Sequence, residues 1–275
     1  MTARSQRAAT LLVGGFLAFA FTMVAAVQIA AWTIGATERT THQVVPGPIR
    51  MLEVDAGAAD IVIVPTAGDD VRIDSSAKGR LHTPRIRAVK DGMKVRLRGS
   101  CPSFSVGPCR ASVVMHVPAS ISVDVRSDSG DLSASGLSGS VSLRTGSGDV
   151  NADGLTGSAD LQTQSGDVNV RALNGPLALR TASGDVNGED LGADTVEAAS
   201  ASGDVELDFR LAPSDVEAST SSGDVDVVVP RGDTYRGESD TGSGDSEVGV
   251  KTDPKATRVI RARTNSGDAM VGYGN

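Results

Sequence analysis

The 275-residue sequence is poor in aromatic side chains and in cysteine. Phe, Trp and Tyr together make up 3% of the chain, and two cysteines and one tryptophan stand against 32 glycines. A large globular core of Phe and Trp is therefore excluded. The composition instead suits a thin core of Val, Leu and Ala, of the kind that stacked repeats build.

Residues 8–37 lack any charged side chain, and the stretch from Leu11 to Trp32 is almost wholly apolar. This is about the 20 residues that a transmembrane helix needs. Arg4 and Arg7 precede it, so the positive-inside rule predicts a cytoplasmic N-terminus and an extracellular remainder. A cleaved signal peptide is the alternative, but the run exceeds the usual signal core of about 7–15 residues. We predict an uncleaved anchor over residues 1–36 and a polar stalk over residues 37–49.

A Ser-Gly-Asp tripeptide recurs eight times between residues 129 and 268, at intervals that grow from 18 to 23 residues. A regular spacing of this kind indicates a stacked-repeat architecture. The aspartates that mark the copies are Asp131, Asp149, Asp167, Asp185, Asp204, Asp224, Asp245 and Asp268.

Most repeats contain two apolar pairs, one on either side of the tripeptide. In the third copy these residues are Ala159, Leu161, Val168 and Val170. Apolar residues two positions apart indicate strands with one buried face, and the phase changes where Gly and Asp favour a turn. Only the copy ending at Asp245 lacks the first pair, since Gly237 and Ser239 occupy those positions. We therefore predict an all-β solenoid of stacked two-strand coils, with a period of about 18–21 residues.

The repeated aspartates would form a row of like charges if the coils stack. At a spacing of about 4.8 Å, two unit charges repel by about 0.9 kcal/mol in water. Two arrangements would relieve the repulsion: turn amides hold the carboxylates, or the row attracts cations such as calcium. The sequence favours the amides, because Gly-Asp turns commonly make such bonds.

The exported domain is predicted to span residues 50–275, with an irregular cap or insertion over 61–126 and regular repeats over 127–275. A degenerate repeat centred on Asp60 opens it. Alternating runs at 71–73, 95–97 and 113–117 indicate strands in the insertion, and Asp91-Gly92 between two of them predicts a hairpin. An antiparallel cap of this kind would close the exposed end of the array.

Cys101 and Cys109 are the only cysteines. Outside a membrane, a pair this close in sequence is expected to form a disulfide. Zinc binding is the alternative, but it needs two more ligands, and His42, His82 and His116 show no ligand spacing. We predict the disulfide and neither a metal nor a cofactor.

Charge is distributed unevenly along the domain. Residues 50–126 carry 12 basic and 8 acidic side chains, whereas residues 127–275 carry 11 basic and 25 acidic ones. The repeats should therefore repel nucleic acid. The insertion has a basic run that could contact anionic lipid or cell-wall polymer, although a solvated strand face is the simpler interpretation. Its members are Arg80, Arg85, Arg87, Lys90, Lys94, Arg96 and Arg98.

Catalytic signals are weak. Ser75-Ser76-Ala77-Lys78 matches a Ser-x-x-Lys pattern without the other motifs of the enzymes that use it. No Ser/His/Asp set has supporting context. Arg231-Gly232-Asp233, which matches an integrin-binding tripeptide, is most simply a turn.

The repeated Thr-x-Ser-Gly-Asp-Val units, the opening segment 54–63 and the late Val-Val-Val-Pro at 227–230 resemble a bacterial family. It is a family of β-strand-repeat domains of unknown function, often labelled putative adhesins. The resemblance covers about residues 50–275 and implies a β-solenoid at the cell envelope, sometimes associated with envelope-stress systems. It implies no catalytic residue.

From these features we expect a non-enzymatic, membrane-anchored envelope protein whose repetitive surface binds cell-wall material or a protein partner. Two alternatives remain at this stage. One is an accessory or sensor protein of an envelope-stress response, and the other is a polysaccharide-acting β-helix enzyme.

Overall fold

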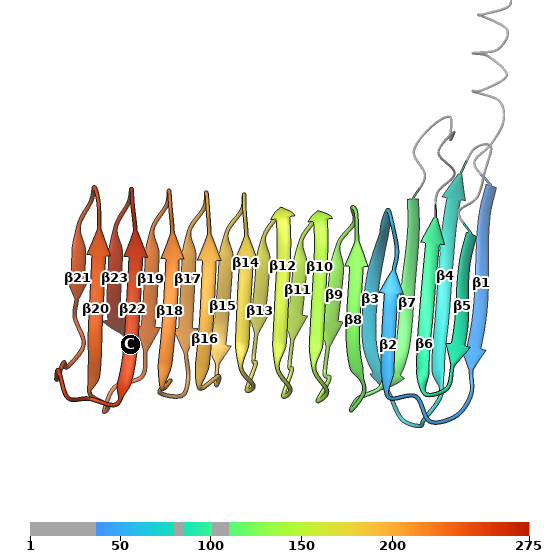
Figure 1. Ribbon diagram of the computed structural model, residues 1–275, viewed down its shortest axis with the longest axis horizontal. Coiled ribbons are helices and arrows are strands. Elements are labelled where there is room, and N and C mark those ends of the chain that lie inside the picture. The colour runs from blue at the N-terminus through green and yellow to red at the C-terminus, as the bar shows by residue number, and fades with distance from the viewer. Residues whose placement is uncertain (1–36, 80–84, 101–109, 275) are drawn as a thin grey trace, which may run out of the picture.

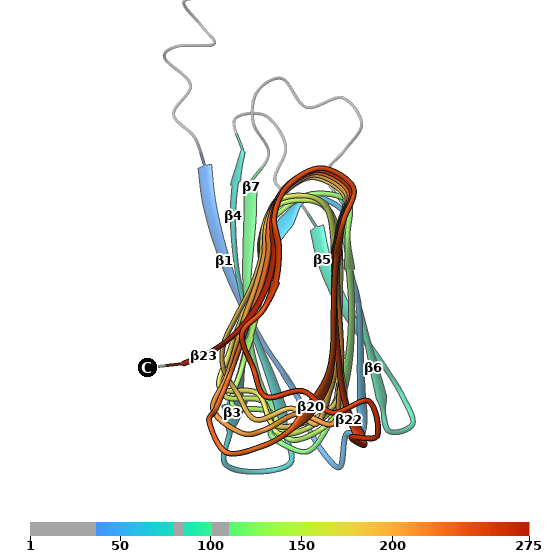
Figure 2. The same cartoon turned by 90° about the vertical axis from the view of Figure 1, so that its left-hand side faces the viewer.

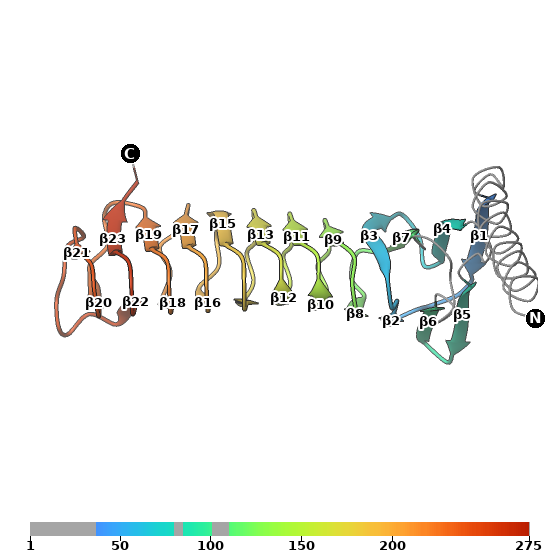
Figure 3. The ribbon, with the colours of Figure 1, turned by 90° about the horizontal axis from the view of Figure 1, so that it is seen from above.

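The computed structural model describes residues 37–79, 85–100 and 110–274, and their strands form two long sheets. The sheets face each other along an extended column, which Figure 1 shows from the side and Figure 3 from above. Seen along its axis in Figure 2, the column is a flattened loop whose two walls are the sheets.

Sheet A contains 12 strands. In spatial order they are β1 (Thr37–Val45), β4 (Val71–Gly79), β7 (Arg110–Pro118), β3 (Ala59–Thr66), β9 (Leu132–Ser135), β11 (Val150–Asp153), β13 (Val168–Arg171), β15 (Val186–Leu191), β17 (Val205–Phe209), β19 (Val225–Val229), β23 (Ala269–Tyr273) and β21 (Ser246–Val248).

Sheet B contains 11 strands. In spatial order they are β20 (Tyr235–Thr241), β22 (Arg258–Thr264), β18 (Asp215–Thr220), β16 (Thr195–Ser200), β14 (Leu177–Thr181), β12 (Ala159–Ser165), β10 (Val141–Ser147), β8 (Ser122–Ser127), β2 (Met51–Asp55), β6 (Lys94–Ser100) and β5 (Arg85–Asp91).

The predicted solenoid is confirmed. Each coil runs up a strand of sheet B, turns at Ser-Gly-Asp and returns along a strand of sheet A, so neighbouring coils pair in parallel. Equivalent residues are in register: Leu143 of β10 lies opposite Leu161 of β12, 18 residues later. An antiparallel meander is thereby excluded for the repeats. The predicted first repeat is also confirmed, because β2 pairs with β8 and β3 pairs with β9.

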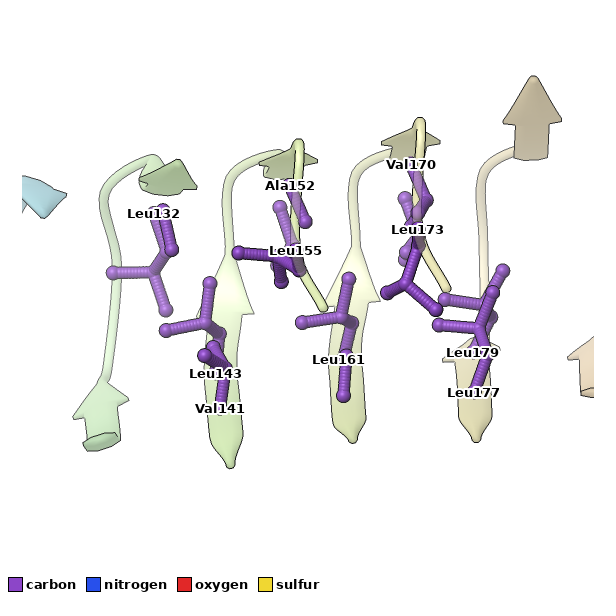
Figure 4. Close-up of a cluster of buried hydrophobic side chains, with 14 of the residues drawn as sticks. Leu132, Val141, Leu143, Ala152, Leu155, Leu161, Val170, Leu173, Leu177 and Leu179 are labelled. Atoms are coloured by element: carbon purple, nitrogen blue, oxygen red, sulfur yellow. The ribbon is translucent and has the colours of Figure 1, made fainter. Parts of the chain in front are cut away.

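The core is the thin layer between the sheets. Figure 4 shows Leu143, Leu161 and Leu179 stacking from coil to coil, with Leu155 and Leu173 filling the far corner. All five side chains are at most 1% exposed. Each coil alone cannot bury its apolar face, so these stacked contacts are what stabilise the fold.

The last two coils do not follow chain order. β22 and β23, which come last in the chain, lie between β18/β19 and β20/β21. The coil that contains Asp245 therefore ends the column, although the chain reaches it before the coil that contains Asp268. The sequence did not predict this exchange.

The N-terminal end is closed by antiparallel strands, as expected for a cap. β4 pairs antiparallel with β7, and β5 pairs with β6 in the hairpin predicted at Asp91-Gly92. The stalk predicted for residues 37–49 is wrong over most of its length. Nine of those residues form β1, which pairs antiparallel with β4 and lies at one edge of sheet A. Its residues are polar from Thr37 to Gln43, which suits a strand at the edge of a sheet.

The predicted anchor over residues 1–36 lies outside the described residues. Within the part of the chain that is described, no segment forms a helix with the length and apolarity that a bilayer crossing requires.

Candidate functional site

The repeated aspartates line one corner of the column. Except at Asp245, which ends the row, the Oδ1 atom of each accepts a hydrogen bond from the backbone N–H of the aspartate in the next coil, for example from Asp185 N to Asp167 Oδ1 at 2.9 Å. Eight such bonds of 2.7–3.2 Å join nine aspartates into one continuous row. The row runs Asp60, Asp131, Asp149, Asp167, Asp185, Asp204, Asp224, Asp268, Asp245.

This arrangement confirms the first of the two expectations for the row: backbone amides hold the carboxylates. A charge-assisted bond at each step offsets the repulsion between neighbouring acids. In the described residues, no group of three or more His, Cys, Asp or Glu side chains is placed to hold a metal ion.

A second row, of hydroxyl groups, runs beside the aspartates. The side chain four residues before each aspartate donates to the glycine carbonyl of the neighbouring coil, as Thr163 Oγ1 does to Gly148 O at 3.0 Å. These bonds measure 2.8–3.2 Å, and all but Thr241 of the donors are buried. The donors are Ser127, Thr145, Thr163, Thr181, Ser200, Thr220, Thr264 and Thr241.

Glycine at the corner has a steric reason as well as a conformational one. Gly166 has a φ of +142°, and a Cβ built on it would lie 2.2 Å from the carbonyl oxygen of Gly148. Any side chain there would force the coils apart. The aspartate and the hydroxyl residue of each corner thus bond neighbouring coils together, and the glycine lets the coils approach closely.

The remaining sequence candidates separate into three outcomes. Cys101 and Cys109 lie outside the described residues, so their disulfide stays a prediction. Ser75 is buried in β4 and donates to the carbonyl of Thr41, at 3.4 Å. The side chain of Lys78 lies outside the described residues, so the Ser-x-x-Lys match stays a weak sequence signal. Arg231-Gly232-Asp233 is a turn, as expected.

That turn borders a hollow on sheet A. The Arg231 guanidinium lies 5.3 Å from the centre of the Tyr273 ring, and Asp233 is paired with Arg258 at 3.2 Å. The hollow has a volume of about 680 Å³ and is also lined by Val229. Both charged side chains of Arg231-Gly232-Asp233 therefore contact other residues of the chain.

The basic face predicted in the insertion is partly neutralised. Glu53 of β2 pairs with Lys94 and, at 3.4 Å, with Arg96. The hydrogen bond from Lys94 is the main reason why the pKa of the Glu53 carboxyl lies below its usual value. Lys90 donates to the carbonyl of Pro46.

The structure also gathers residues that are far apart in sequence. His42 of β1, Asp74 of β4 and His116 of β7 meet on the outer face of sheet A, with His42 Nδ1 2.7 Å and His116 Nε2 3.6 Å from the carboxylate of Asp74. Their sequence spacing gave no signal, because only the strand order brings them together.

The outer face of sheet B carries a network of opposite charges. Arg144 lies between Asp124 and Asp160, and Arg180 lies between Asp160 and Glu197, with separations of 2.6–3.9 Å for the three looser pairs. Towards the C-terminal end the network continues with Arg261, Arg263, Glu217 and Glu238. The charges on this face are largely satisfied by one another.

The outer face of sheet A carries a row of amides instead. Asn169 Nδ2 donates to Asn151 Oδ1 at 3.2 Å, and Asn187 Nδ2 donates to Asn169 Oδ1 at 3.1 Å. These side chains lie in an open groove of about 360 Å³. The sequence signal for them, an Asn two residues after three consecutive repeat aspartates, is plain once the register is known.

Comparison with known proteins agrees with this geometry. A family model described as Toastrack DUF4097 matches residues 49–271. No curated protein matches the chain. Among solved structures, a putative adhesin from Parabacteroides distasonis is similar, at 12% identity over 86% of this chain and 97% of that one, with a TM-score of 0.50. A putative adhesin from Bacteroides fragilis matches at 16% identity over 88% and 99% of the two chains, with a TM-score of 0.46.

At 12% identity the Parabacteroides distasonis structure supports the fold alone, whereas the family model covers most of the sequence. The chain therefore belongs to the Toastrack DUF4097 family, a family of unknown function.

Proposed function

We propose that this protein is a non-enzymatic, membrane-anchored component of the bacterial cell envelope that binds envelope material through its repeated outer faces. Residues 1–36 would anchor it, with the N-terminus in the cytoplasm and the column outside. The repeats would avoid nucleic acid because of their excess of acidic side chains.

The observation that supports this proposal best is that the repeated residues at the corner of the column already serve the fold. Its aspartates, hydroxyls and glycines are committed to holding coils together, so the conspicuous repeated residues offer little chemistry to a substrate. What each coil presents to solvent is a short ordered strip of polar side chains. Summed over many coils, such strips give binding by avidity rather than a single catalytic centre.

The test is binding of the full chain, solubilised in detergent micelles, to isolated bacterial envelope fragments. One 18-residue period can be removed by deleting residues 150–167, which joins Asp149 to Val168 and keeps the register. Duplicating the same 18 residues gives the matched control. We expect binding to weaken modestly in the deletion and to strengthen in the duplication.

Two results would contradict the proposal. One is the absence of binding to envelope fragments from any source. The other is complete loss of function on changing a single side chain, together with release of soluble sugar, which would indicate an enzyme.

A further inference from the structure

We infer that the asparagine groove on the outer face of sheet A is a binding site for a neutral, hydroxyl-rich polymer, an extended glycan without charged groups. The inference rests on the proposed function, because it gives the repetitive surface a ligand class. The groove is defined here by Ser133, Asn151, Asn169 and Asn187 with the flanking Asp153, Arg171 and Glu189.

The groove is ordered before any ligand arrives. Asn151, Asn169 and Asn187 occupy equivalent positions on β11, β13 and β15 and are in register. Each is half-buried, and the bonds of 3.2 Å and 3.1 Å along the row fix the orientation of the amides. Binding would therefore cost little side-chain entropy, in contrast to binding by long exposed side chains.

Each amide retains hydrogen-bonding capacity. A carboxamide has two N–H donors and two acceptor lone pairs. Asn169, in the middle of the row, uses one donor towards Asn151 and one lone pair towards Asn187. At least one donor and one acceptor therefore remain on each of the three amides. A sugar hydroxyl also offers both a donor and an acceptor, so the groove matches a chain of hydroxyl groups.

The charges beside the groove favour a neutral ligand. On one side Arg171 is paired with Asp153 at 3.1 Å, and Glu189 lies next to them. On the other side runs the aspartate row, whose members include the exposed Asp149 and Asp185. An acidic polysaccharide or a nucleic acid would meet these carboxylates without a free cation to receive it.

The spacing and the ends of the row indicate an extended ligand that lies along the column. Neighbouring parallel strands are about 4.8 Å apart, so one amide is presented at each such step. Beyond Asn187 the equivalent positions hold Glu206 on β17 and Asp226 on β19. The neutral stretch therefore covers the coils from Ser133 to Asn187, which limits the site to a few sugar units.

The experiment measures binding of the full chain in detergent micelles to chitohexaose and cellohexaose, with oligogalacturonate as the acidic probe. We expect a neutral hexasaccharide to bind and oligogalacturonate to bind at least tenfold more weakly. The triple variant Asn151→Ala/Asn169→Ala/Asn187→Ala should lose at least tenfold in affinity. Gln162→Ala, which removes an amide from the sheet B face of the same coil, is the matched control and should bind like the parent.

A single variant guards against loss of folding in the triple one. Asn169→Asp keeps an oxygen for the bond from Asn187 but adds a charge and removes a donor, so it should also weaken binding to the neutral probes. Unaltered affinity in both asparagine variants, or an equal loss in Gln162→Ala, would overturn the inference. So would a parent chain that binds envelope fragments but neither hexasaccharide, a result that would leave the proposed function standing. Failure to bind envelope fragments as well would overturn both.

Discussion

The interior coils and the coil that ends the column share the same motif but differ in the residues that face the interior. In the interior coil of β12, the two inward positions before the corner hold Ala159 and Leu161, which are buried. In β20 of the end coil, the equivalent positions hold Gly237 and Ser239, and the Ser239 hydroxyl donates to the carbonyl of Ala269 at 2.6 Å. The end coil is thus polar where the interior coils are apolar.

This difference accounts for the exchanged order of the last two coils. An apolar interior must be covered by a coil on both sides, and the coil with Ile260 and Ala262 has such an interior. A coil with a polar interior tolerates solvent on one side and can close the column. The segment after β21 also shields the free edge of β20, because Tyr235 N donates to Lys251 O and Asp253 N donates to Tyr235 O.

The largest effect is expected from a substitution that disrupts an interior corner. Gly166→Ala places a Cβ against the Gly148 carbonyl at a positive φ, so we expect a loss of about 3 kcal/mol or more in the free energy of unfolding. Gly232→Ala is the control, because Gly232 also has a positive φ but no other atom lies within 4 Å of the place that a Cβ would take. It should cost only about 1–2 kcal/mol. Urea unfolding of both variants measures the difference, and equal losses would contradict the close stacking of coils.

A second comparison concerns the aspartate row. Asp167→Ala removes the acceptor for the Asp185 amide and should cost about 1–2 kcal/mol. Asp245 ends the row, and no donor among the described residues reaches its carboxylate. Asp245→Ala should therefore change stability by no more than about 0.5 kcal/mol. If thermal unfolding shows the two variants to be equally destabilised, the row does not act as described.

A third comparison concerns buried hydroxyl groups. Thr163→Val removes the bond to Gly148 in an interior coil and should cost about 1 kcal/mol. Tyr235 in the end coil is fully buried, and its hydroxyl has no partner in the described part of the chain. Burial raises its pKa to about 12. Tyr235→Phe should leave stability unchanged or raise it by about 1 kcal/mol, and a clear loss in the melting temperature would contradict this.

The smallest effect is expected from a substitution near the cap at the opposite, N-terminal end of the column. Because the pKa of the Glu53 carboxyl is lowered in the folded protein, its ion pairs stabilise the fold at neutral pH. This contribution is lost as the pH falls through the lowered pKa. Glu53→Gln should lower the melting temperature slightly at pH 7 and have no effect in acid, where the carboxyl of Glu53 is protonated. A difference that persists in acid would show that the ion pairs with Lys94 and Arg96 are not its source.

The repeat made much of the fold predictable. The apolar pairs gave the strands and their buried face, the change of phase at Ser-Gly-Asp gave the corner, and Asp91-Gly92 gave the hairpin of the cap. These features are local, since each depends on residues within one strand or one turn.

Coil order and the edge strand β1 were not predictable in the same way. Ile260 and Ala262 fit against any neighbouring coil, so the residues of β22 do not specify their place. The signal in the sequence was Gly237 and Ser239. The equivalent positions are apolar in the other repeats, so a repeat without them marks the coil that ends the column. Thr37–Val45 is too polar to indicate a buried strand, and its pairing depends on the distant β4. The asparagine groove likewise required the register before its three amides could be placed side by side.

The most direct test of the stacked column is the proximity of equivalent residues in its last coils. Asp226 of β19 is the register partner of Met270 in β23, whereas Glu247 of β21 lies one strand further away. In a chain with Cys101 and Cys109 replaced by serine, we predict that Asp226→Cys/Met270→Cys forms a disulfide on mild oxidation. Asp226→Cys/Glu247→Cys should remain reduced. Cross-linking of the second pair and not the first would contradict the account.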